Sequence, residues 1–168
     1  MVALQNDYQR ELNASGIANI LDPARLQHDG TLGESKRIIG SAKAVITKYR
    51  KQMDILRASL EEEIKKLRLS AESKSEVLRG FRDSQKRRRA EDEAMWKCEE
   101  GVVSQFENIV ALLSRRRGGW IIQNGELHFL NESDLGEFNS YLTMIDHLIR
   151  KQEELQKQAV GAAKALLN

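Results

Sequence analysis

A stretch of 81 residues, from Glu34 to Ser114, contains no proline and only three glycines. Proline breaks a helix by removing a backbone donor, so a proline-free stretch that is rich in strong helix formers predicts a long α-helix. One unbroken helix of that length would extend roughly 120 Å at about 1.5 Å per residue. The 168-residue chain has a single proline (Pro23) and few aromatic residues, which favours a mainly all-α protein of one structural domain.

Within residues 34–117, apolar residues recur every three or four positions, which is typical of one helix face. Ala42, Met53 and Ile64 are eleven residues apart, and this period favours a straight or slightly right-handed bundle; an extended coiled coil remains open. A C-terminal helix is too short to cover both the apolar stripe at residues 42–71 and the apolar residues at 95–113. We therefore expect self-association through the stripe, unless the first 33 residues fold over it. Its central residues are Tyr49, Met53, Leu56, Leu60, Ile64 and Leu67.

Four consecutive basic residues interrupt the apolar pattern within this helix: Lys86, Arg87, Arg88 and Arg89. The pattern allows a bend near residues 80–94, but strong helix formers fill that segment and favour a continuous helix. Acidic residues follow the three arginines by four positions, at 91–93, so we predict three ion pairs within the helix. The net charge is only +2 and no helix-turn-helix or zinc-finger pattern accompanies the run, which favours a solvated face over a nucleic-acid site.

Residues 118–131 change to the period of two that is typical of β-strands. Two short apolar runs, 120–123 and 126–129, flank Asn124 and Gly125, which predicts a β-hairpin with a type I′ turn and Trp120 opposite Phe129. Four side chains then share one side of the ribbon and are candidate interaction residues: Trp120, Ile122, Leu127 and Phe129. They either cap the ends of the two helices that the hairpin connects, or form a docking surface for a partner.

Two flanking segments complete the expected architecture. Residues 1–33 predict short helices and loops, and Thr31 with Glu34 resembles a capping box for the long helix. Residues 132–168 predict a helix capped by Ser133 or Asp134. The expected fold is an elongated helical bundle or coiled coil with one long central helix (34–117), a C-terminal antiparallel helix, and a short β-hairpin (118–131) between them.

Residue types that support catalysis or metal binding do not occur in a known arrangement. His28, His128 and His147 have no partner at zinc-ligand spacing, and the lone Cys98 lies in the middle of the predicted helix. The sequence contains no phosphate loop, nucleophile elbow or dinucleotide-binding fingerprint. We therefore expect a protein that is not an enzyme and that uses no cofactor and no metal.

These features favour a non-enzymatic coiled-coil interaction or assembly protein that self-associates. The alternative is a membrane-active or secreted effector-like helical protein that applies the hairpin or its amphipathic helices to a target surface; nucleic-acid binding through the basic run ranks third. The first residues do not resemble a secretory signal, and no window approaches about 18 apolar residues. The expected location is the cytoplasm, with export by a dedicated machine left open.

Overall fold

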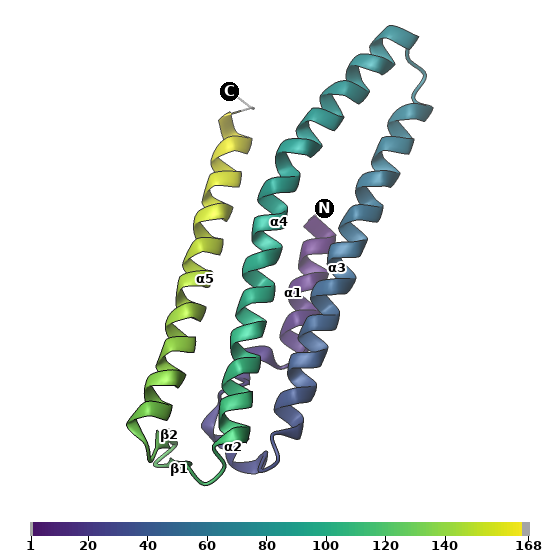
Figure 1. The fold of residues 1–168 in the computed structure, drawn as a ribbon. Helices are drawn as coiled ribbons and strands as arrows, with labels where there is room; N and C mark the ends of the chain where they lie inside the picture. Colours follow the sequence, from purple (N-terminus) through teal and green to yellow (C-terminus); the bar gives the residue numbers. More distant parts are fainter. Residues whose placement is uncertain (1, 166–168) are drawn as a thin grey trace.

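Helices dominate the computed structural model of this chain, which describes residues 2–165 (Figure 1). In chain order the elements are α1 (Val2–Ala14), a 3₁₀ turn η1 (Ile17–Asn19), α2 (Pro23–His28), α3 (Gly33–Lys66), α4 (Ala71–Arg115), β1 (Trp120–Gln123), β2 (Glu126–Phe129) and α5 (Glu132–Ala165). The expected fold class is confirmed, because the chain is mainly helical and has a long helix, a C-terminal helix and an antiparallel β-hairpin between them.

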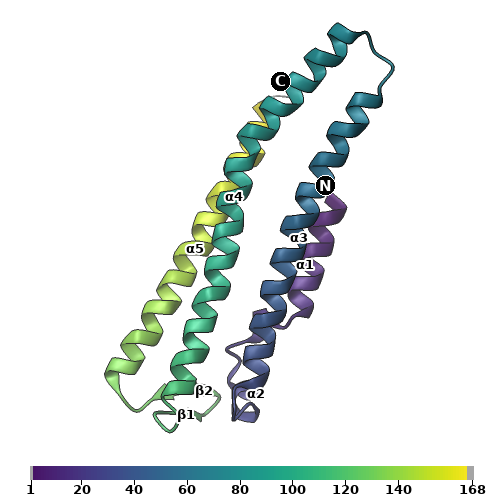
Figure 2. The ribbon, with the colours of Figure 1, turned by 45° about the vertical axis from the view of Figure 1, so that its right-hand side comes forward.

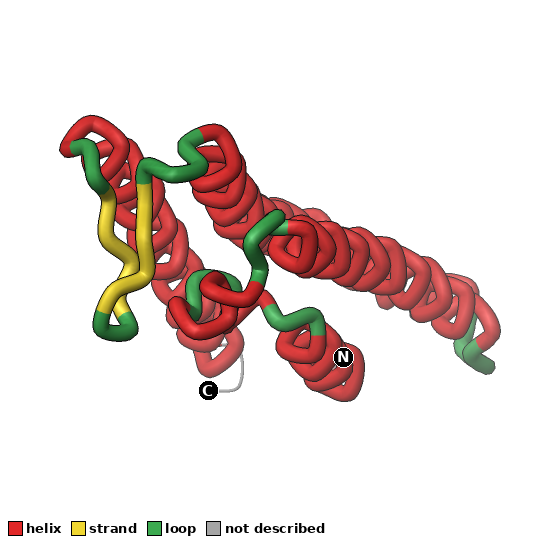
Figure 3. Tube along the Cα trace, turned by 90° about the horizontal axis from the view of Figure 1, so that it is seen from below, coloured by secondary structure: helices red, strands yellow, loops and turns green. Residues whose placement is uncertain are grey.

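The four longer helices run roughly side by side, and the chain reverses direction from α1 to α3, from α3 to α4, and from α4 to α5 (Figures 1 and 2). Helix α4 is central, since it packs against α3 on one side and α5 on the other, while α1 packs against α3. Seen from below in Figure 3, α1 and α2 lie on one face of the α3–α4 pair, and α5 inclines toward that same face.

The prediction of one helix over 34–117 is wrong in one respect, because the chain turns back at residues 67–70. Leu67 leaves the helical conformation with ψ of 141°, and the Ser70 side chain accepts a hydrogen bond from the backbone N–H of Ser73 (3.1 Å), which begins α4. A single helix would expose the apolar stripes of both halves, whereas the reversal packs one half against the other. The segment 80–94 is continuous helix, as the helix formers there predicted.

The core lies in the half of the bundle where α1, α3, α4 and α5 are all present. Side chains of α3 and α4 form its centre, and the turns around η1 and α2 close one end. Its most deeply buried members include Ile20, Leu26, Leu32, Ile38, Ala42, Ile46, Ile109, Val110 and Leu113. The first 33 residues therefore fold over the start of the apolar stripe. The sequence predicted an exposed stripe only if these residues did not cover it.

Asp29, rather than a Thr31–Glu34 capping box, organises the start of α3. Its carboxylate accepts hydrogen bonds from the backbone N–H of Ser35 (2.8 Å), the Ser35 hydroxyl (2.7 Å) and the backbone N–H of Glu34 (3.2 Å). The Thr31 hydroxyl accepts from the Gly33 backbone N–H at 3.3 Å and from no Glu34 N–H among the described residues. The capping-box prediction is wrong because Leu32 adopts a left-handed conformation (φ 57°), which brings the earlier Asp29 over the helix end.

The start of α5 also differs from the prediction of a Ser133 or Asp134 cap. The Asn131 side chain accepts from the backbone N–H of Ser133 at 2.7 Å, so the helix begins at Glu132. Asp134 is buried and pairs with Arg116 at 2.9 Å. This ion pair joins the end of α4 to the start of α5 across the hairpin.

Candidate functional site

The β-hairpin forms as predicted, and its apolar side faces the bundle. Trp120 lies opposite Phe129 and Gln123 opposite Glu126, and positive φ at Asn124 (53°) and Gly125 (77°) fits the predicted turn. The four candidate interaction residues are each partly buried and pack against the core: Trp120, Ile122, Leu127 and Phe129. This placement favours a packing role for them over a docking role.

Two contacts fix the hairpin to its neighbours. The Trp120 indole N–H donates to the backbone carbonyl of Leu113 in α4 at 2.9 Å. The ring centroids of Phe129 and Phe138 of α5 lie 5.1 Å apart. The hairpin thus closes the end of the α4–α5 pair, which is the end nearest the viewer in Figure 3.

The basic run lies on the outer part of α4, and the three predicted ion pairs within the helix do not form. Asp92 pairs with Arg57 of α3, and Glu93 pairs with Arg50 of α3 at 2.5 Å. The reversal at 67–70 brings these two arginines of α3 close to the carboxylates of α4. The carboxylates therefore pair with α3 rather than with the arginines at 87–89. Within residues 2–165, no ion pair involves Lys86, Arg87, Arg88 or Arg89.

The proposed oligomer stripe is divided by the fold into a covered part and an open part. Tyr49 is buried against Tyr8 of α1, at 5.5 Å between ring centroids. Met53, Leu56 and Ile64 are half-buried, whereas Leu60 and Leu67 are exposed. Coverage decreases along the stripe because α3 extends beyond the N-terminal end of α1.

Residues 54–90 form a two-helix arm, which extends beyond the N-terminal end of α1 (Figures 1 and 2). Each helix of the arm has the other as its main neighbour, so apolar side chains remain open on the sides. The exposed large apolar residues of the arm are Ile55, Leu60, Leu67, Leu69 and Val77. Its interior is partly polar, since the side-chain oxygen of Gln85 is buried there and has no hydrogen-bond partner in the described part of the chain.

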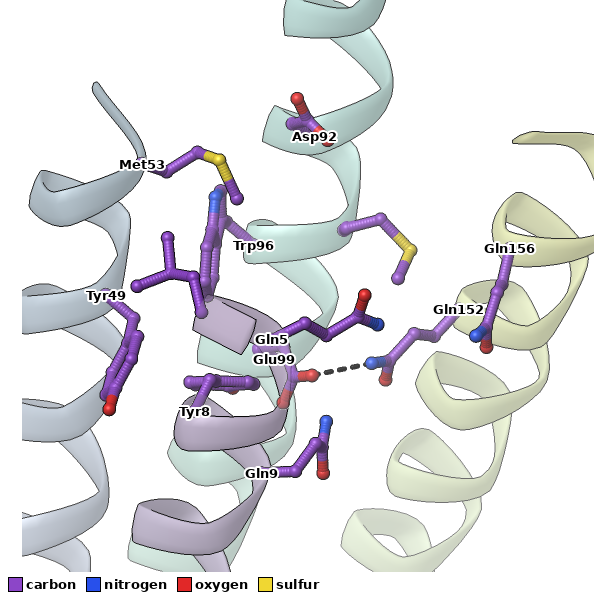
Figure 4. A pocket seen from close by; sticks show the side chains of 12 residues that line it. Gln5, Tyr8, Gln9, Tyr49, Met53, Asp92, Trp96, Glu99, Gln152 and Gln156 are labelled. Atoms are coloured by element: carbon purple, nitrogen blue, oxygen red, sulfur yellow. Dashed lines mark hydrogen bonds between the residues drawn. The ribbon is translucent and has the colours of Figure 1, made fainter. Parts of the chain in front are cut away.

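A cavity of about 280 Å³ lies where α1, α3, α4 and α5 approach one another. Figure 4 shows aromatic and thioether side chains on its α3 and α4 sides, the aromatic Tyr8 on α1, and glutamine side chains on its α1 and α5 sides. The Glu99 carboxylate projects toward α5 and accepts a hydrogen bond from the Gln152 amide at 2.6 Å (Figure 4). The residues that line the cavity are Leu4, Gln5, Tyr8, Gln9, Tyr49, Met53, Asp92, Met95, Trp96, Glu99, Gln152 and Gln156.

The Tyr8 hydroxyl is the most unusual polar group of this cavity. Tyr8 is 6% exposed, and its oxygen makes no hydrogen bond of normal geometry among the described residues, although the Glu99 carboxylate lies close to it. Burial raises the pKa of Tyr8 well above its usual value, and the negative charge of the nearby Glu99 raises it further. The hydroxyl therefore remains a neutral donor at physiological pH.

Sequence reasoning did not single out the cavity residues. The available signals were weak: Gln5 and Gln9 are four residues apart in α1, and Gln152 and Gln156 are four residues apart in α5. Such spacing places each pair on one helix face. It does not reveal that the two faces meet, because that depends on how the helices pack.

The titratable residues considered for catalysis or metal binding do not converge. His28, His128 and His147 lie in α2, β2 and α5, and Cys98 is buried in α4. Among the described residues, no group of three or more His, Cys, Asp or Glu side chains is arranged to hold a metal ion.

Comparison of the sequence with protein-family models, with curated proteins and with solved structures found no match. Within residues 2–165, no helix combines the length and apolar character that crossing a membrane requires.

Proposed function

We propose that this chain is a non-enzymatic helical interaction protein that assembles with a second copy of itself through the arm (residues 54–90). The observation that carries the proposal is the set of apolar side chains that the chain itself leaves open there, with Ile55 at 58% and Leu67 at 47% exposure. Exposed apolar residues gathered on one protruding element are typical of interaction sites. Exposed large apolar side chains also occur outside the arm, on the hairpin and α5, and the test below includes two of them as a control.

Charge complementarity supports a second copy as the partner. The arm carries acidic residues 61–63 on α3 and basic residues 86–89 on α4, and these lie at different distances from its tip. In an antiparallel pair of arms, a two-fold axis places each acidic segment beside the basic segment of the other copy. The arginines Arg87, Arg88 and Arg89, which form no ion pair within residues 2–165, then gain partners.

The other two functional readings receive less support. The hairpin was the candidate surface for an effector-like role, and its apolar side is directed into the bundle. The basic run was the candidate for nucleic-acid binding, and no helix-turn-helix or zinc-finger pattern accompanies it in the sequence. We place the assembled protein in the cytoplasm, where a buried free thiol such as Cys98 is ordinary.

The test compares the solution mass of the parent chain with that of the double variant Ile55→Glu, Val77→Glu. Both side chains are exposed, so the variant keeps the fold while it places charge on the proposed contact. Light scattering at tens of micromolar is expected to give a dimer or larger assembly for the parent and a monomer for the variant.

The matched control is the double variant Leu130→Glu, Met144→Glu, which changes two exposed apolar residues outside the arm. It is expected to keep the mass of the parent. A monomeric parent chain, or equal dissociation of both double variants, would contradict assembly through the arm. Circular dichroism of each variant confirms that helix content is unchanged.

A further inference from the structure

The cavity between α1, α3, α4 and α5 has the composition of a site for a positively charged ligand. Two of its twelve lining residues are acidic, and none is Lys, Arg or His. Asp92 is already paired with Arg57, whereas no basic side chain described in the structure is paired with Glu99. We propose that this cavity binds a small organic ammonium ion, with Glu99 as its counter-ion. This inference is independent of the arm and of the assembly proposed above.

The aromatic side chains add a second preference for a cation. The rings of Tyr8 and Trp96 both line the cavity, 5.4 Å apart between centroids and nearly perpendicular at 85°. The two rings contact each other edge to face, and the face of an aromatic ring attracts a cation through its quadrupole. The indole ring is the strongest of the aromatic groups in this respect. Met53 and Met95 add polarisable thioethers that suit the alkyl groups of an ammonium ligand.

The Tyr8 hydroxyl is a second polar group in the cavity, beside the Glu99 carboxylate. It makes no hydrogen bond of normal geometry among the described residues, so it can bond to a ligand. A ligand that carries its own hydroxyl, or an ammonium N–H, supplies the missing partner. The hydroxyl also lies close to Glu99, so a ligand cation bound by Glu99 is within reach of the hydroxyl.

The rim of the cavity consists of four glutamine side chains, two from α1 and two from α5 (Figure 4). Amide oxygens accept hydrogen bonds from an ammonium N–H or a ligand hydroxyl, and they carry no charge that would oppose a cation. The volume of about 280 Å³ is at the lower end of the range for small-molecule pockets. The ligand is therefore a compact ammonium compound rather than a nucleotide or a peptide.

The experiment uses choline as the probe and 3,3-dimethylbutan-1-ol, which has the same shape without the charge, as the comparison ligand. The readout is the indole N–H resonance of Trp96 in the ¹⁵N-labelled full chain, assigned by its loss in Trp96→Phe. Sodium chloride at equal ionic strength controls for salt. Choline is expected to shift the resonance saturably, and the alcohol to bind about tenfold more weakly or worse, because it forms no ion pair.

Two glutamate variants test the role of Glu99. Glu99→Gln keeps an amide oxygen for Gln152 and is expected to weaken choline binding about tenfold while leaving alcohol binding unchanged. Glu153→Gln removes the same charge from an exposed position of α5 outside the cavity and is expected to leave both unchanged. Equal affinity for choline and the alcohol in the parent chain, or no saturable shift with choline, would overturn the proposal whatever the variants do.

Discussion

The carboxylate of Asp29 joins the short helix α2 to the long helix α3. Burial by itself raises the pKa of this carboxyl, but hydrogen bonds from Ser35, from the backbone N–H of Glu34 and from Arg25 outweigh burial and hold it below its usual value. A carboxyl with a lowered pKa stabilises the folded state above its ordinary pKa of about 3.9. That stabilisation is lost as the pH falls through the lower, folded-state pKa.

We expect Asp29→Asn to reduce the free energy of unfolding at pH 7 by about 1.5–3 kcal/mol, since hydrogen bonds to a buried charge are lost. Urea unfolding at pH 7 and at pH 3 measures this. The difference between parent and variant should shrink at pH 3, where the parent is losing its charge on Asp29. Asp146→Asn, which breaks an exposed ion pair with Arg150, is the control and should cost well under 1 kcal/mol. An equal cost of Asp29→Asn at both pH values would show that the charge is unimportant.

Asp29 also shows where sequence reasoning fails at the scale of single residues. Thr31 and Glu34 have the spacing of a capping box, and nothing in the local sequence indicates that Leu32 takes a left-handed conformation. Leu32 is fully buried, so packing of its side chain in the core fixes that conformation. A cap that depends on a buried side chain cannot be predicted from spacing alone.

At the scale of elements, the hairpin was predictable and the reversal between α3 and α4 was not. Asn124 and Gly125 specify their turn through their own backbone preferences, so four or five residues carry the signal. The reversal at 67–70 contains no proline or glycine. Its cause is the pairing of two distant apolar stripes, and only Ser70, as a helix N-cap, marks the position locally.

The contact between α4 and α5 depends on a glycine. A Cβ atom on Gly101 would lie 2.9 Å from Cδ1 of Leu148, which is closer than carbon atoms can approach. We expect Gly101→Leu to destabilise the chain by about 1–3 kcal/mol, because a large side chain there forces the two helices apart. Thermal unfolding measures the change.

The matched control is Gly40→Leu, since Gly40 also lies within a long helix but has open space around it. A leucine there should stabilise the chain by up to about 1 kcal/mol through its better helix propensity. Similar melting temperatures for the two variants would show that the close approach of α4 and α5 at Gly101 is unimportant.

At the scale of the whole molecule, the cavity and the arm both depend on how the helices are assembled. The cavity takes residues from four helices, so its chemistry exists only when α1 and α5 are both in place beside the α3–α4 pair. The arm exists because α3 and α4 extend beyond α1. Periodicity predicted the apolar faces of these helices, but the relative lengths and the packing partner of each face depend on the assembled fold.

The arm should open more readily than the four-helix half, and this difference is measurable by amide hydrogen exchange. Two-helix packing covers less of each backbone, and the buried side-chain oxygen of Gln85 has no hydrogen-bond partner within residues 2–165. Residues 103–113 of α4 include several of the most buried side chains, so their amides should exchange only on global unfolding. In dilute protein we expect amides of 58–85 to exchange at least about tenfold faster than those of 103–113.

Hydrogen exchange at several protein concentrations then distinguishes an arm that opens readily by itself from an arm that a second copy covers. Assembly through the arm stabilises only the assembled state, so protection at 58–85 should rise with protein concentration by mass action. Protection at 103–113 should stay constant, and the Ile55→Glu, Val77→Glu variant should show no concentration dependence in either segment. Arm amides as slow as those of 103–113 at high dilution would mean that the α3–α4 pair is fully stable alone, and the arm would then have no need of a partner.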